Sequence, residues 1–378
     1  MGAGQLGRML AQKASEWDLD IAFLDKAKDF PAGKVNPNLD IGDFKSYEDV
    51  LAFGRTKDII SIEIENVNTD ALLVLEKEGK KVIPSAEIIA TIKDKGLQKQ
   101  YYKSHKLPSS EFQLFADKKS IIESLDKAEI QLPFIQKSRE AGYDGKGVQL
   151  VKDRSDIGKI MDTPSVIEKM VDIHKEVALI VARNEKSQIQ HFDPVEMVFD
   201  PEANLLDYLL CPADIDDSVK KQMEEIADKL VSSWNFTGLL AIEFFIDKNS
   251  RVLINEVAPR THNSGHHSID CCESSQFEMQ LRTLLNLDLV SGKIIYKYCG
   301  IVNLVGEADS GVGPVNYEGL ESILKLDGVY PHIYGKQTVK PFRKMGHVTV
   351  AANTKDELQQ KIQTIKKSIR VISWQKNA

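Results

Sequence analysis

The chain has 378 residues, of which 42% are hydrophobic and 28% charged, as expected for a globular protein of two or three domains. A net charge of −7 provides no basic surface for nucleic acid, and no apolar run reaches the roughly 18 residues of a membrane span. The cysteines at 211, 271, 272 and 299 lack the spacing of zinc ligands. We therefore expect reduced thiols in a cytoplasmic protein with no nucleic-acid or membrane partner.

The opening stretch Gly2-Ala3-Gly4-Gln5-Leu6-Gly7 matches the G-x-G-x-x-G fingerprint, and Asp25 ends the next strand-like run, where a ribose-binding acid would lie. This pattern favours an NAD-dependent dehydrogenase as one hypothesis. No strand precedes the glycines in this chain, so we expect the first strand of such a sheet to be absent. The alternative is a glycine turn at a helix N-terminus that meets any phosphate or carboxylate.

Helical and strand-like runs alternate up to residue 92, with helices expected over 46–53 and 69–77 and strands over 21–24, 58–63 and 81–83. This rhythm predicts an open parallel α/β sheet. Glu63 and Glu65 lie at the carboxyl end of a predicted strand, where ligands bind in such sheets, so either could meet a substrate.

A second group of motifs lies between residues 132 and 176. Lys137 ends a strand-like run, and Gly142-Tyr143-Asp144-Gly145-Lys146-Gly147 follows it. Three glycines around a lysine predict a mobile loop that covers phosphates, although a tight hairpin turn is the alternative. The P-loop pattern is excluded because no Lys-Ser/Thr pair opens a helix. A further predicted strand begins after Glu176.

The run from Gly238 to His267 predicts a β-hairpin with strands over 239–246 and 251–257 and a turn of four residues, 247–250. In that register Glu243 lies opposite Ile254 and diagonal to Glu256, so both carboxylates share one face. A shift of one residue would place them on opposite faces. Close oxygen ligands suit Mg²⁺ held against a phosphate, whereas two solvated glutamates are the alternative.

Histidines and basic residues follow this hairpin. His262, His266 and His267 could form a metal cluster, but we expect hydrogen-bonded loop histidines, because neighbours in one loop seldom converge on one ion. The basic loop 336–344 could bind a phosphate or lie in solvent, and we place His347 in the strand after it. A final helix, capped by residues 354–357, is predicted to bury a stripe of four aliphatic side chains: Leu358, Ile362, Ile365 and Ile369.

Lys137, the GYDGKG loop, Glu168-Lys169 and the Glu243/Glu256 hairpin together resemble an ATP-grasp enzyme. More narrowly, GAGQLGRM, GYDGKG, NEVAPRTHNSGHH and the pair YGK and RKMGHVT resemble the N5-carboxyaminoimidazole ribonucleotide synthase family. The resemblance implies an N-terminal α/β domain over residues 1–92 and an ATP-grasp domain over 93–297 with a lid at about 131–183. A small C-terminal α+β domain would occupy residues 298–378.

The same resemblance implies a ligase that joins ATP, bicarbonate and 5-aminoimidazole ribonucleotide in purine biosynthesis, as a homodimer with Mg²⁺ or alternatively Mn²⁺. The runner-up is another ATP-grasp ligase, such as the formate-dependent glycinamide ribonucleotide transformylase. A non-catalytic ATP-binding module is a third hypothesis.

The resemblance also implies roles for individual residues at the positions that match the family's motifs. Mg²⁺ would be held by Glu243 and Glu256. The nucleotide would be bound by Lys95, Lys137, Gly142, Tyr143, Asp144, Gly145, Lys146, Gly147, Glu168, Lys169, Met170, Val171, Glu176, Asn255 and Glu256. The substrate would meet Tyr143, Asp144, His262, Asn263, Ser264, Lys336, Arg343 and Lys344. The resemblance gives catalytic roles to Arg260 at carboxyphosphate and to Lys336 and Arg343 at the 5′-phosphate. Three positions depart from the family's pattern: Phe199, Thr261 and Phe342.

Overall fold

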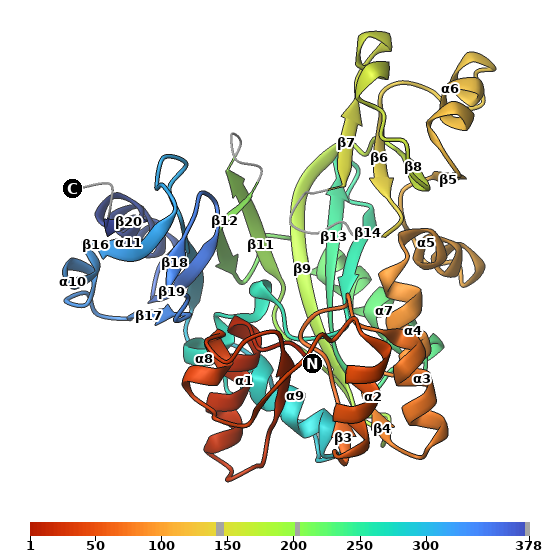
Figure 1. Ribbon diagram of the computed structural model, residues 1–378. Coiled ribbons are helices and arrows are strands. Elements are labelled where there is room, and N and C mark those ends of the chain that lie inside the picture. The colour runs from red at the N-terminus through yellow and green to blue at the C-terminus, as the bar shows by residue number, and fades with distance from the viewer. Residues whose placement is uncertain (141–146, 201–204, 375–378) are drawn as a thin grey trace.

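The computed structural model describes residues 1–140, 147–200 and 205–374. Among these residues, the largest unit is a nine-stranded sheet in the order β14-β13-β9-β11-β12-β15-β19-β17, with β10 paired to β9 (Figure 1). Its strands are β9 (Ile173–Arg183), β10 (Ile189–His191), β11 (Val195–Asp200), β12 (Leu205–Cys211), β13 (Gly238–Asp247), β14 (Val252–Ala258), β15 (Tyr298–Val305), β17 (Val329–Ile333) and β19 (Lys344–Ala352). The predicted boundary at residue 298 therefore lies inside one continuous sheet.

Two helices cover opposite faces of β9 and β13. Helix α7 (Asp217–Ser233) packs its buried stripe, including Met223 and Leu230, against Leu179 and Ile242. Helix α9 (Gln276–Leu284) places Met279 on the other face, with Ile180, Ala182, Leu239 and Ala241. Glu243 follows Ala241 at the strand's two-residue period, so its side chain lies on the α9 face.

A separate four-stranded sheet, β5-β8-β6-β7, rises beside the large one (Figure 1). It contains β5 (Phe112–Phe115), β6 (Phe134–Ser138), β7 (Val148–Val151) and β8 (Ser165–Lys169), with α6 (Lys118–Asp126) packed on it. The predicted lid range of about 131–183 does not coincide with this sheet. It omits β5 and α6, and it includes β9, which belongs to the large sheet.

The N-terminal domain has the predicted parallel pairs, β1 (Phe23–Asp25) with β2 (Leu39–Ile41) and β3 (Ile59–Ile60) with β4 (Lys81–Val82). Its helices are α1 (Gln5–Ser15), α2 (Tyr47–Arg55), α3 (Thr69–Lys77) and α4 (Ala86–Lys93). Residues 1–3 run between the two pairs. Gly2 N donates to Leu24 O at 3.0 Å, and Glu63 N donates to Met1 O at 3.0 Å. The glycine loop is thus tied into the domain, and the strand predicted over 58–63 is only two residues long.

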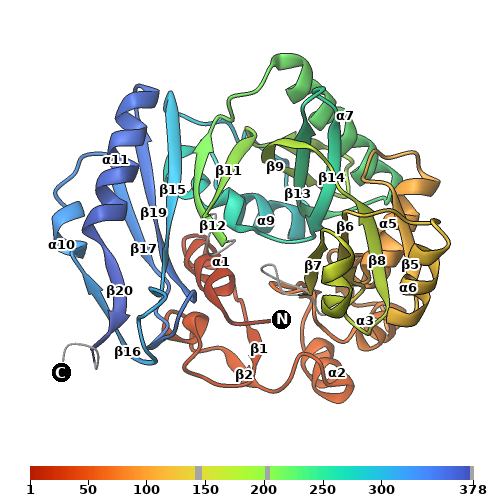
Figure 2. The ribbon, with the colours of Figure 1, turned by 90° about the horizontal axis from the view of Figure 1, so that it is seen from above.

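The remaining elements complete the C-terminal part and the connections. They are α5 (Lys95–Ser104), α8 (Ser268–Cys271), β16 (Gly313–Glu318), α10 (Leu320–Ile323), β18 (Thr338–Val339), α11 (Lys355–Ser368) and β20 (Arg370–Ser373). The buried stripe predicted for the last helix is confirmed on and just after α11. Figure 2 shows α1 between the C-terminal strands and the four-stranded sheet. Met9 of α1, Phe277 of α9 and Tyr334 form one buried cluster, which joins the three parts of the chain. Among the described residues, no helix has both the length and the hydrophobicity needed to cross a membrane.

The glycine loop binds a carboxylate of the chain itself. Gly4 N donates to Glu63 Oε1 at 2.5 Å, and Gly7 N donates to Glu63 Oε2. Asp25 is buried and accepts from Ala3 N at 2.7 Å. The two features on which the dehydrogenase hypothesis rests are therefore not free to bind a dinucleotide. The N-terminus of α1 binds Glu63, and Asp25, the expected ribose-binding acid, binds Ala3 N. A Cβ on Gly2 would lie 2.4 Å from Glu63 Cγ, so only glycine fits there.

Replacing Glu63 by alanine would leave the two glycine amide groups without an acceptor. We expect the Glu63→Ala variant to lose about 2 kcal/mol of unfolding free energy, the typical cost of stranding hydrogen-bond donors. Urea denaturation would measure it against Glu16→Ala, which removes an exposed acid at the other end of α1. Equal stability of the two variants would contradict the structural role of Glu63.

Candidate active site

Glu243 and Glu256 lie directly opposite each other on β13 and β14. The predicted register is wrong near the turn, where Ile246 pairs with Val252 rather than with Arg251. That register alone would have sent the two carboxylates to opposite faces. A β-bulge at Asn255 adds one residue to β14 and brings Glu256 back to the face of Glu243. The shared face was predicted correctly, but the bulge that produces it was not.

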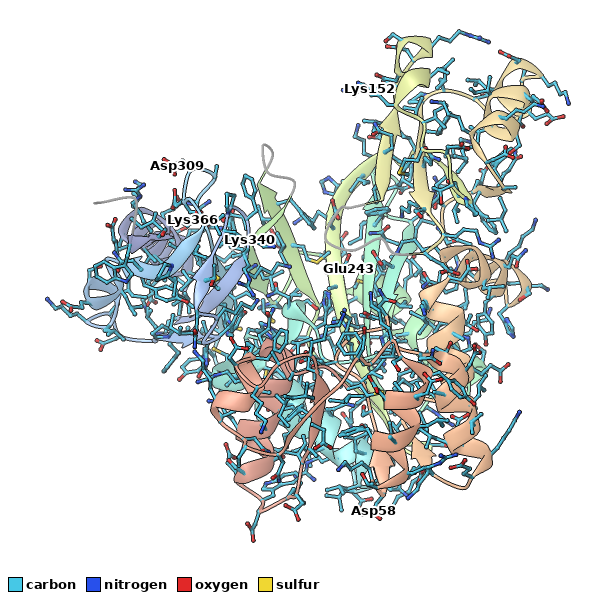
Figure 3. The ribbon with its side chains drawn as sticks, in the orientation of Figure 1. Asp58, Lys152, Glu243, Asp309, Lys340 and Lys366 are labelled. Carbon is cyan, nitrogen blue, oxygen red and sulfur yellow. The ribbon has the colours of Figure 1, made fainter. Side chains whose placement is uncertain are left out.

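The carboxylates on this face repel one another. Burial raises the pKa of Glu243 to about 8, and the nearby charges of Glu256 and Glu176 act in the same direction. The charges of Lys344 and Lys137 lower that pKa but do not reverse the shift. Burial also raises the pKa of Glu176. This face thus brings several carboxylate oxygens together. Figure 3 shows Glu243 near the centre of the molecule.

Two lysines reach the carboxylate face from other elements. Lys95, at the start of α5, pairs with Glu256 at 2.6 Å. Lys137, on β6, donates to Asn255 Oδ1 at 2.9 Å, which places an ammonium group beside the bulge. The structure therefore brings together Lys95, Lys137, Asn255 and Glu256 from three separate stretches of the chain. A region where cations and carboxylates alternate suits a metal-bound polyphosphate.

Beneath this face lies a buried ionic network centred on Glu168. Its carboxylate is 3.3 Å from Lys99 Nζ and 3.2 Å from Lys137 Nζ, and it accepts from Ser110 Oγ at 2.5 Å. Burial alone would raise the pKa of Glu168, but the two lysines and the hydroxyl hold it below its usual value. The side chain of Lys99 is only 2% exposed, so it orients Glu168 rather than reaching a ligand.

The sequence analysis did not single out Lys99 or Ser110. Lys99 lies four residues after Lys95 in α5, and the helical period would have placed the two on one face. Nothing in the sequence indicates that Ser110 reaches Glu168, because the contact crosses between separate elements.

Removal of Lys99 tests the network. We expect Lys99→Met, which keeps the length of the side chain, to cost about 3 kcal/mol of stability, because Glu168 stays buried with one partner fewer. The matched control is Lys119→Met, where both partners of the ion pair are largely exposed and the loss should be below about 0.5 kcal/mol. Urea denaturation compares them, and equally small losses would show that the network contributes nothing.

Arg260 reaches the N-terminal domain from the loop after β14. Its guanidinium is 2.9 Å from Glu65, and it donates to Thr261 O at 3.0 Å. Arg260 Nε is buried and has no partner among the described residues. Of the two acids at the end of β3, Glu63 therefore binds the glycine loop, whereas Glu65 faces Arg260. This unpaired N–H donor suits an anion that a ligand, rather than the protein, would supply.

The loop that follows is held by buried amide groups. Gln276, fully buried at the start of α9, accepts from His262 N at 2.8 Å and donates to His262 O at 2.8 Å. Asn263 pairs with Asn303 of β15 at 2.9 Å, and Ser264 Oγ is 2.9 Å from His262 Nδ1. These contacts leave His262 Nε2 3.6 Å from a Glu243 oxygen. Asn263 and Ser264, predicted to contact substrate, thus bind protein groups, and it is Ser264 and Gln276 that contact His262. The sequence analysis did not single out Gln276, because no sequence motif marks this glutamine.

Among the described residues, the ligand atoms of His262, His266 and His267 do not gather into one group. His266 Nδ1 accepts from Gln276, and its ring stacks near His347 of β19. Burial lowers the pKa values of His266 and His347 well below 6.5, so both rings stay neutral. The expectation that His347 is a strand residue is confirmed.

The C-terminal basic residues divide into two groups. Lys336 Nζ donates to Gln5 Oε1 of α1 and to Lys344 O, both at 2.6 Å. Arg343 instead donates to Thr338 O at 2.7 Å. Lys336 and the backbone of Lys344 therefore lie beside the N-terminus of α1, and the charge of Lys344 acts on Glu243. The side chain of Arg343, between them in the chain, is bound within its own loop.

The other predicted residues fall into three sets. Residues 142–146 of the GYDGKG loop lie outside the described residues. Lys169, Met170 and Val171 are at least partly exposed where β8 ends. The departures from the family's pattern are packed differently: Phe199 lies against the core, Thr261 is buried, and Phe342 is 47% exposed with a positive φ.

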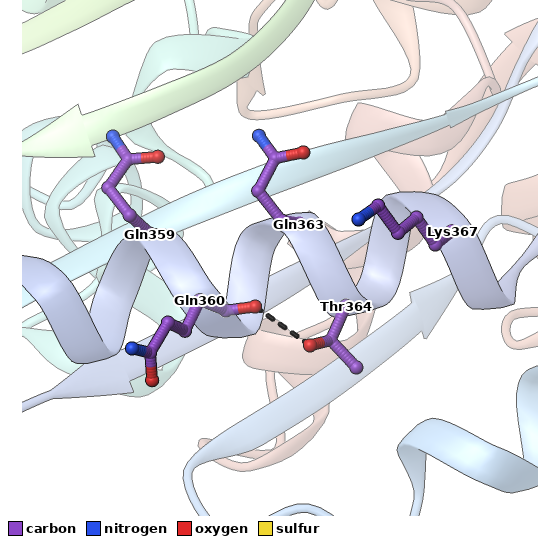
Figure 4. Close-up of a pocket in the computed structure, with 5 residues that line it drawn as sticks. All are labelled: Gln359, Gln360, Gln363, Thr364 and Lys367. Atoms are coloured by element: carbon purple, nitrogen blue, oxygen red, sulfur yellow. Dashed lines mark hydrogen bonds between the residues drawn. The ribbon is translucent and has the colours of Figure 1, made fainter.

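A hollow on the outer face of α11 lies in another region (Figure 4). It is lined by Gln359, Gln360, Gln363, Thr364 and Lys367. Its hydrogen bond from Thr364 to Gln360 O stays within the helix. With one titratable group among these five residues, the hollow offers little chemistry.

Comparisons with known proteins agree with this geometry. The ribonucleotide synthetase preATP-grasp domain model matches residues 1–93, the ATP-grasp domain model residues 100–277, and the phosphoribosylaminoimidazole carboxylase C-terminal domain model residues 299–361. An N5-carboxyaminoimidazole ribonucleotide synthase of Staphylococcus aureus is 32% identical over 365 residues, which cover 95% of this chain and 94% of that protein. The chain belongs to the N5-carboxyaminoimidazole ribonucleotide synthase family.

Solved structures of this family share the whole fold. The N5-carboxyaminoimidazole ribonucleotide synthetase from Thermotoga maritima is 34% identical with a TM-score of 0.90, and the match covers 98% of each chain. An Aspergillus clavatus N5-carboxyaminoimidazole synthase, solved with ADP and 5-aminoimidazole ribonucleotide, has a TM-score of 0.88 at 29% identity, covering 97% of this chain and 96% of that one. The predicted three-part fold class is confirmed.

Longer relatives also match. The phosphoribosylaminoimidazole carboxylase of Ogataea methanolica is 31% identical over 377 residues, which cover 97% of this chain and 68% of that protein. The chain thus spans about two thirds of the length of the fungal and plant carboxylases that it matches.

Proposed function

We propose that this protein carboxylates 5-aminoimidazole ribonucleotide with ATP and bicarbonate, giving N5-carboxyaminoimidazole ribonucleotide, ADP and phosphate. The observation that carries the proposal is the Glu243/Glu256 face, flanked by Lys95 and Lys137, in a chain of this family. The Aspergillus relative, solved with ADP and the aminoimidazole ribonucleotide, supports the choice of substrates.

The chemistry explains why ATP is needed. Bicarbonate is a poor electrophile, because hydroxide would have to leave. Transfer of the γ-phosphoryl group to a bicarbonate oxygen gives carboxyphosphate and ADP. The substrate's exocyclic amine then forms a bond to the carboxyl carbon, the bond to the phosphate oxygen breaks, and the amine loses a proton. The site must bind a triphosphate and keep water from a short-lived intermediate.

The carboxylate face fits a hard divalent cation. Glu243 and Glu256 offer oxygen ligands on one face, and repulsion between them raises the pKa of Glu243, which is already raised by burial. Such ligands suit Mg²⁺ and equally Mn²⁺. When bound, the ion supplies positive charge at the terminal phosphates. In this scheme Asn255 orients Lys137 beside those phosphates.

The nucleotide would lie between the two sheets. Lys137 and Lys95 would neutralise phosphate oxygens, and the backbone of Lys169–Val171, where the chain is at least partly exposed, would meet the adenine edge. Glu176, on β9, would accept from ribose hydroxyl groups. Glu168 stays buried and acts through the lysines that it holds.

The second substrate would lie nearer the N-terminal domain. The buried, unpaired Nε of Arg260 is the donor we assign to carboxyphosphate, and Glu65 orients the guanidinium. His262 lies beside Glu243 at the same end. Lys336, Lys344 and Arg343 would hold the 5′-phosphate, for which Arg343 must leave its contact with Thr338 O.

We further infer that the chain acts in the cytoplasm as a homodimer, as its family resemblance implies. The four cysteines are free thiols, which suits a reducing compartment. Analytical ultracentrifugation would test the dimer directly.

The decisive experiment measures ADP formation with Mg²⁺ against a panel of amine substrates, with bicarbonate, with formate, or with neither. We expect turnover only with 5-aminoimidazole ribonucleotide and bicarbonate. Turnover that needs formate and glycinamide ribonucleotide would instead support a transformylase. ATP binding without turnover under any condition would leave a non-catalytic ATP-binding module.

A matched pair of variants separates chemistry from folding. Glu256→Gln keeps the shape of the side chain but removes its charge, and we expect ADP formation to fall by at least about 100-fold, as for loss of a key electrostatic group. Glu225→Gln, an exposed acid on α7, serves as the control. Undiminished turnover in Glu256→Gln would rule out the metal assignment.

A further inference from the structure

A second group of ligand-type side chains converges away from the carboxylate face. Cys211 ends β12, Cys299 lies in β15, and His267 precedes α8. All three are buried, and their ligand atoms lie within 4.8 Å of one another. Cys211 and Cys299 are direct partners across neighbouring strands, so the sheet itself sets their spacing.

The ring of His267 is oriented as a ligand would be. Its Nδ1 is 3.1 Å from Ser264 O, and since a carbonyl only accepts, Nδ1 carries the proton. The lone pair is therefore on Nε2, which is buried and has no hydrogen-bond partner among the described residues. An imidazole fixed by a backbone carbonyl through one nitrogen, with the other nitrogen free, is the usual arrangement of a metal-binding histidine.

A third thiol borders the same cluster. Cys271, at the end of α8, is fully buried, and its thiol is hydrogen-bonded to the thiol of Cys299. The Cys299 thiol is also hydrogen-bonded to the thiol of Cys211. The neighbouring Cys272 is only half-buried and packs against a different cluster.

We propose that Cys211, Cys299, His267 and Cys271 form a structural zinc site. Three sulfurs and one imidazole nitrogen are a preferred donor set for Zn²⁺, with metal–ligand bonds of about 2.0–2.3 Å that place tetrahedral ligand atoms roughly 3.5–3.8 Å apart. The ligand atoms of Cys211, His267 and Cys299 lie within 4.8 Å of one another and require closure by only about 1 Å, whereas Cys271 lies outside that group and has further to move. Binding would release the thiol protons to solvent and form three Zn–S bonds and one Zn–N bond.

The proposed site is distinct from the magnesium site in ligands and in role. It uses sulfur and nitrogen donors, whereas the carboxylate face uses oxygen, which suits a different ion. The ligands come from β12, β15 and the α8 segment that follows the Arg260–His266 loop. Zinc there would fix this loop against the junction between the ATP-grasp strands and the C-terminal strands.

Metal content of the full-length protein tests the proposal. We expect protein purified without added metal, or reconstituted with zinc, to keep about one Zn²⁺ per chain after dialysis against EDTA, as a closed four-ligand site should. Reconstitution with Co²⁺ in place of zinc should give an intense thiolate-to-cobalt charge-transfer band, which oxygen ligands cannot produce. Absence of both retained zinc and the cobalt band in the wild-type protein would overturn the proposal.

Variants assign the ligands. Cys299→Ser is nearly isosteric and should abolish the cobalt band and lower the melting temperature of the zinc-loaded protein, whereas Cys272→Ser should change neither. His267→Gln should weaken zinc retention and alter the cobalt spectrum while leaving the thiolate band detectable. Full zinc retention in Cys299→Ser, or a Cys211–Cys299 disulfide found by mass spectrometry in place of metal, would contradict the site. These readouts do not depend on the proposed carboxylation.

Discussion

The repulsion between Glu243 and Glu256 is the constraint on which the rest of the site depends. Two carboxylates directly opposite on adjacent strands destabilise a sheet, and the raised pKa of Glu243 shows that burial increases the cost. The chain nonetheless inserts an extra residue, Asn255, which places them on the same face. A folded protein tolerates this arrangement when cations complete it, and Lys95 and Lys137 already lie there.

Around this face, buried polar groups fix the geometry without touching a ligand. Glu168 holds Lys99 and Lys137, Gln276 holds the backbone of His262, and Glu63 fills the glycine loop. Each joins segments far apart in the sequence. Because the nine-stranded sheet continues into the C-terminal part, Lys344, at the start of β19, lies on the same sheet as the carboxylates. Positioning of this kind reduces the entropy cost of bringing bound ligands together.

Local patterns predicted the elements well where periodicity is strong. Helix α3 matches its predicted residues, and the alternation of β13 and β14 indicated the hairpin. The turn register was wrong because a bulge leaves no signature in hydrophobic alternation. The strand of 58–63 was overestimated, since apolar alternation there reflects burial more than pairing.

Chemistry that arises between distant segments was harder to foresee. The G-x-G-x-x-G motif predicts a helix N-terminus that binds an anion, and that much is right, but the sequence cannot show that the anion is Glu63. The cysteines at 211 and 299 are too far apart for any zinc spacing rule, yet strand pairing makes them neighbours. The resemblance identified the family, whereas Lys99, Ser110 and Gln276 emerged only from contacts.

The most direct test of the central account is Mn²⁺ binding, followed by electron paramagnetic resonance in the presence of ADP, in the Glu243→Gln variant. The amide keeps the shape of the side chain but removes one of the two facing carboxylates, so we predict that the folded variant loses the protein-bound Mn²⁺ signal that the wild-type protein gives. Circular dichroism verifies the fold, and Glu225→Gln, an exposed acid on α7, is the matched control. A folded Glu243→Gln protein that binds Mn²⁺ with ADP as tightly as the wild type would contradict the account.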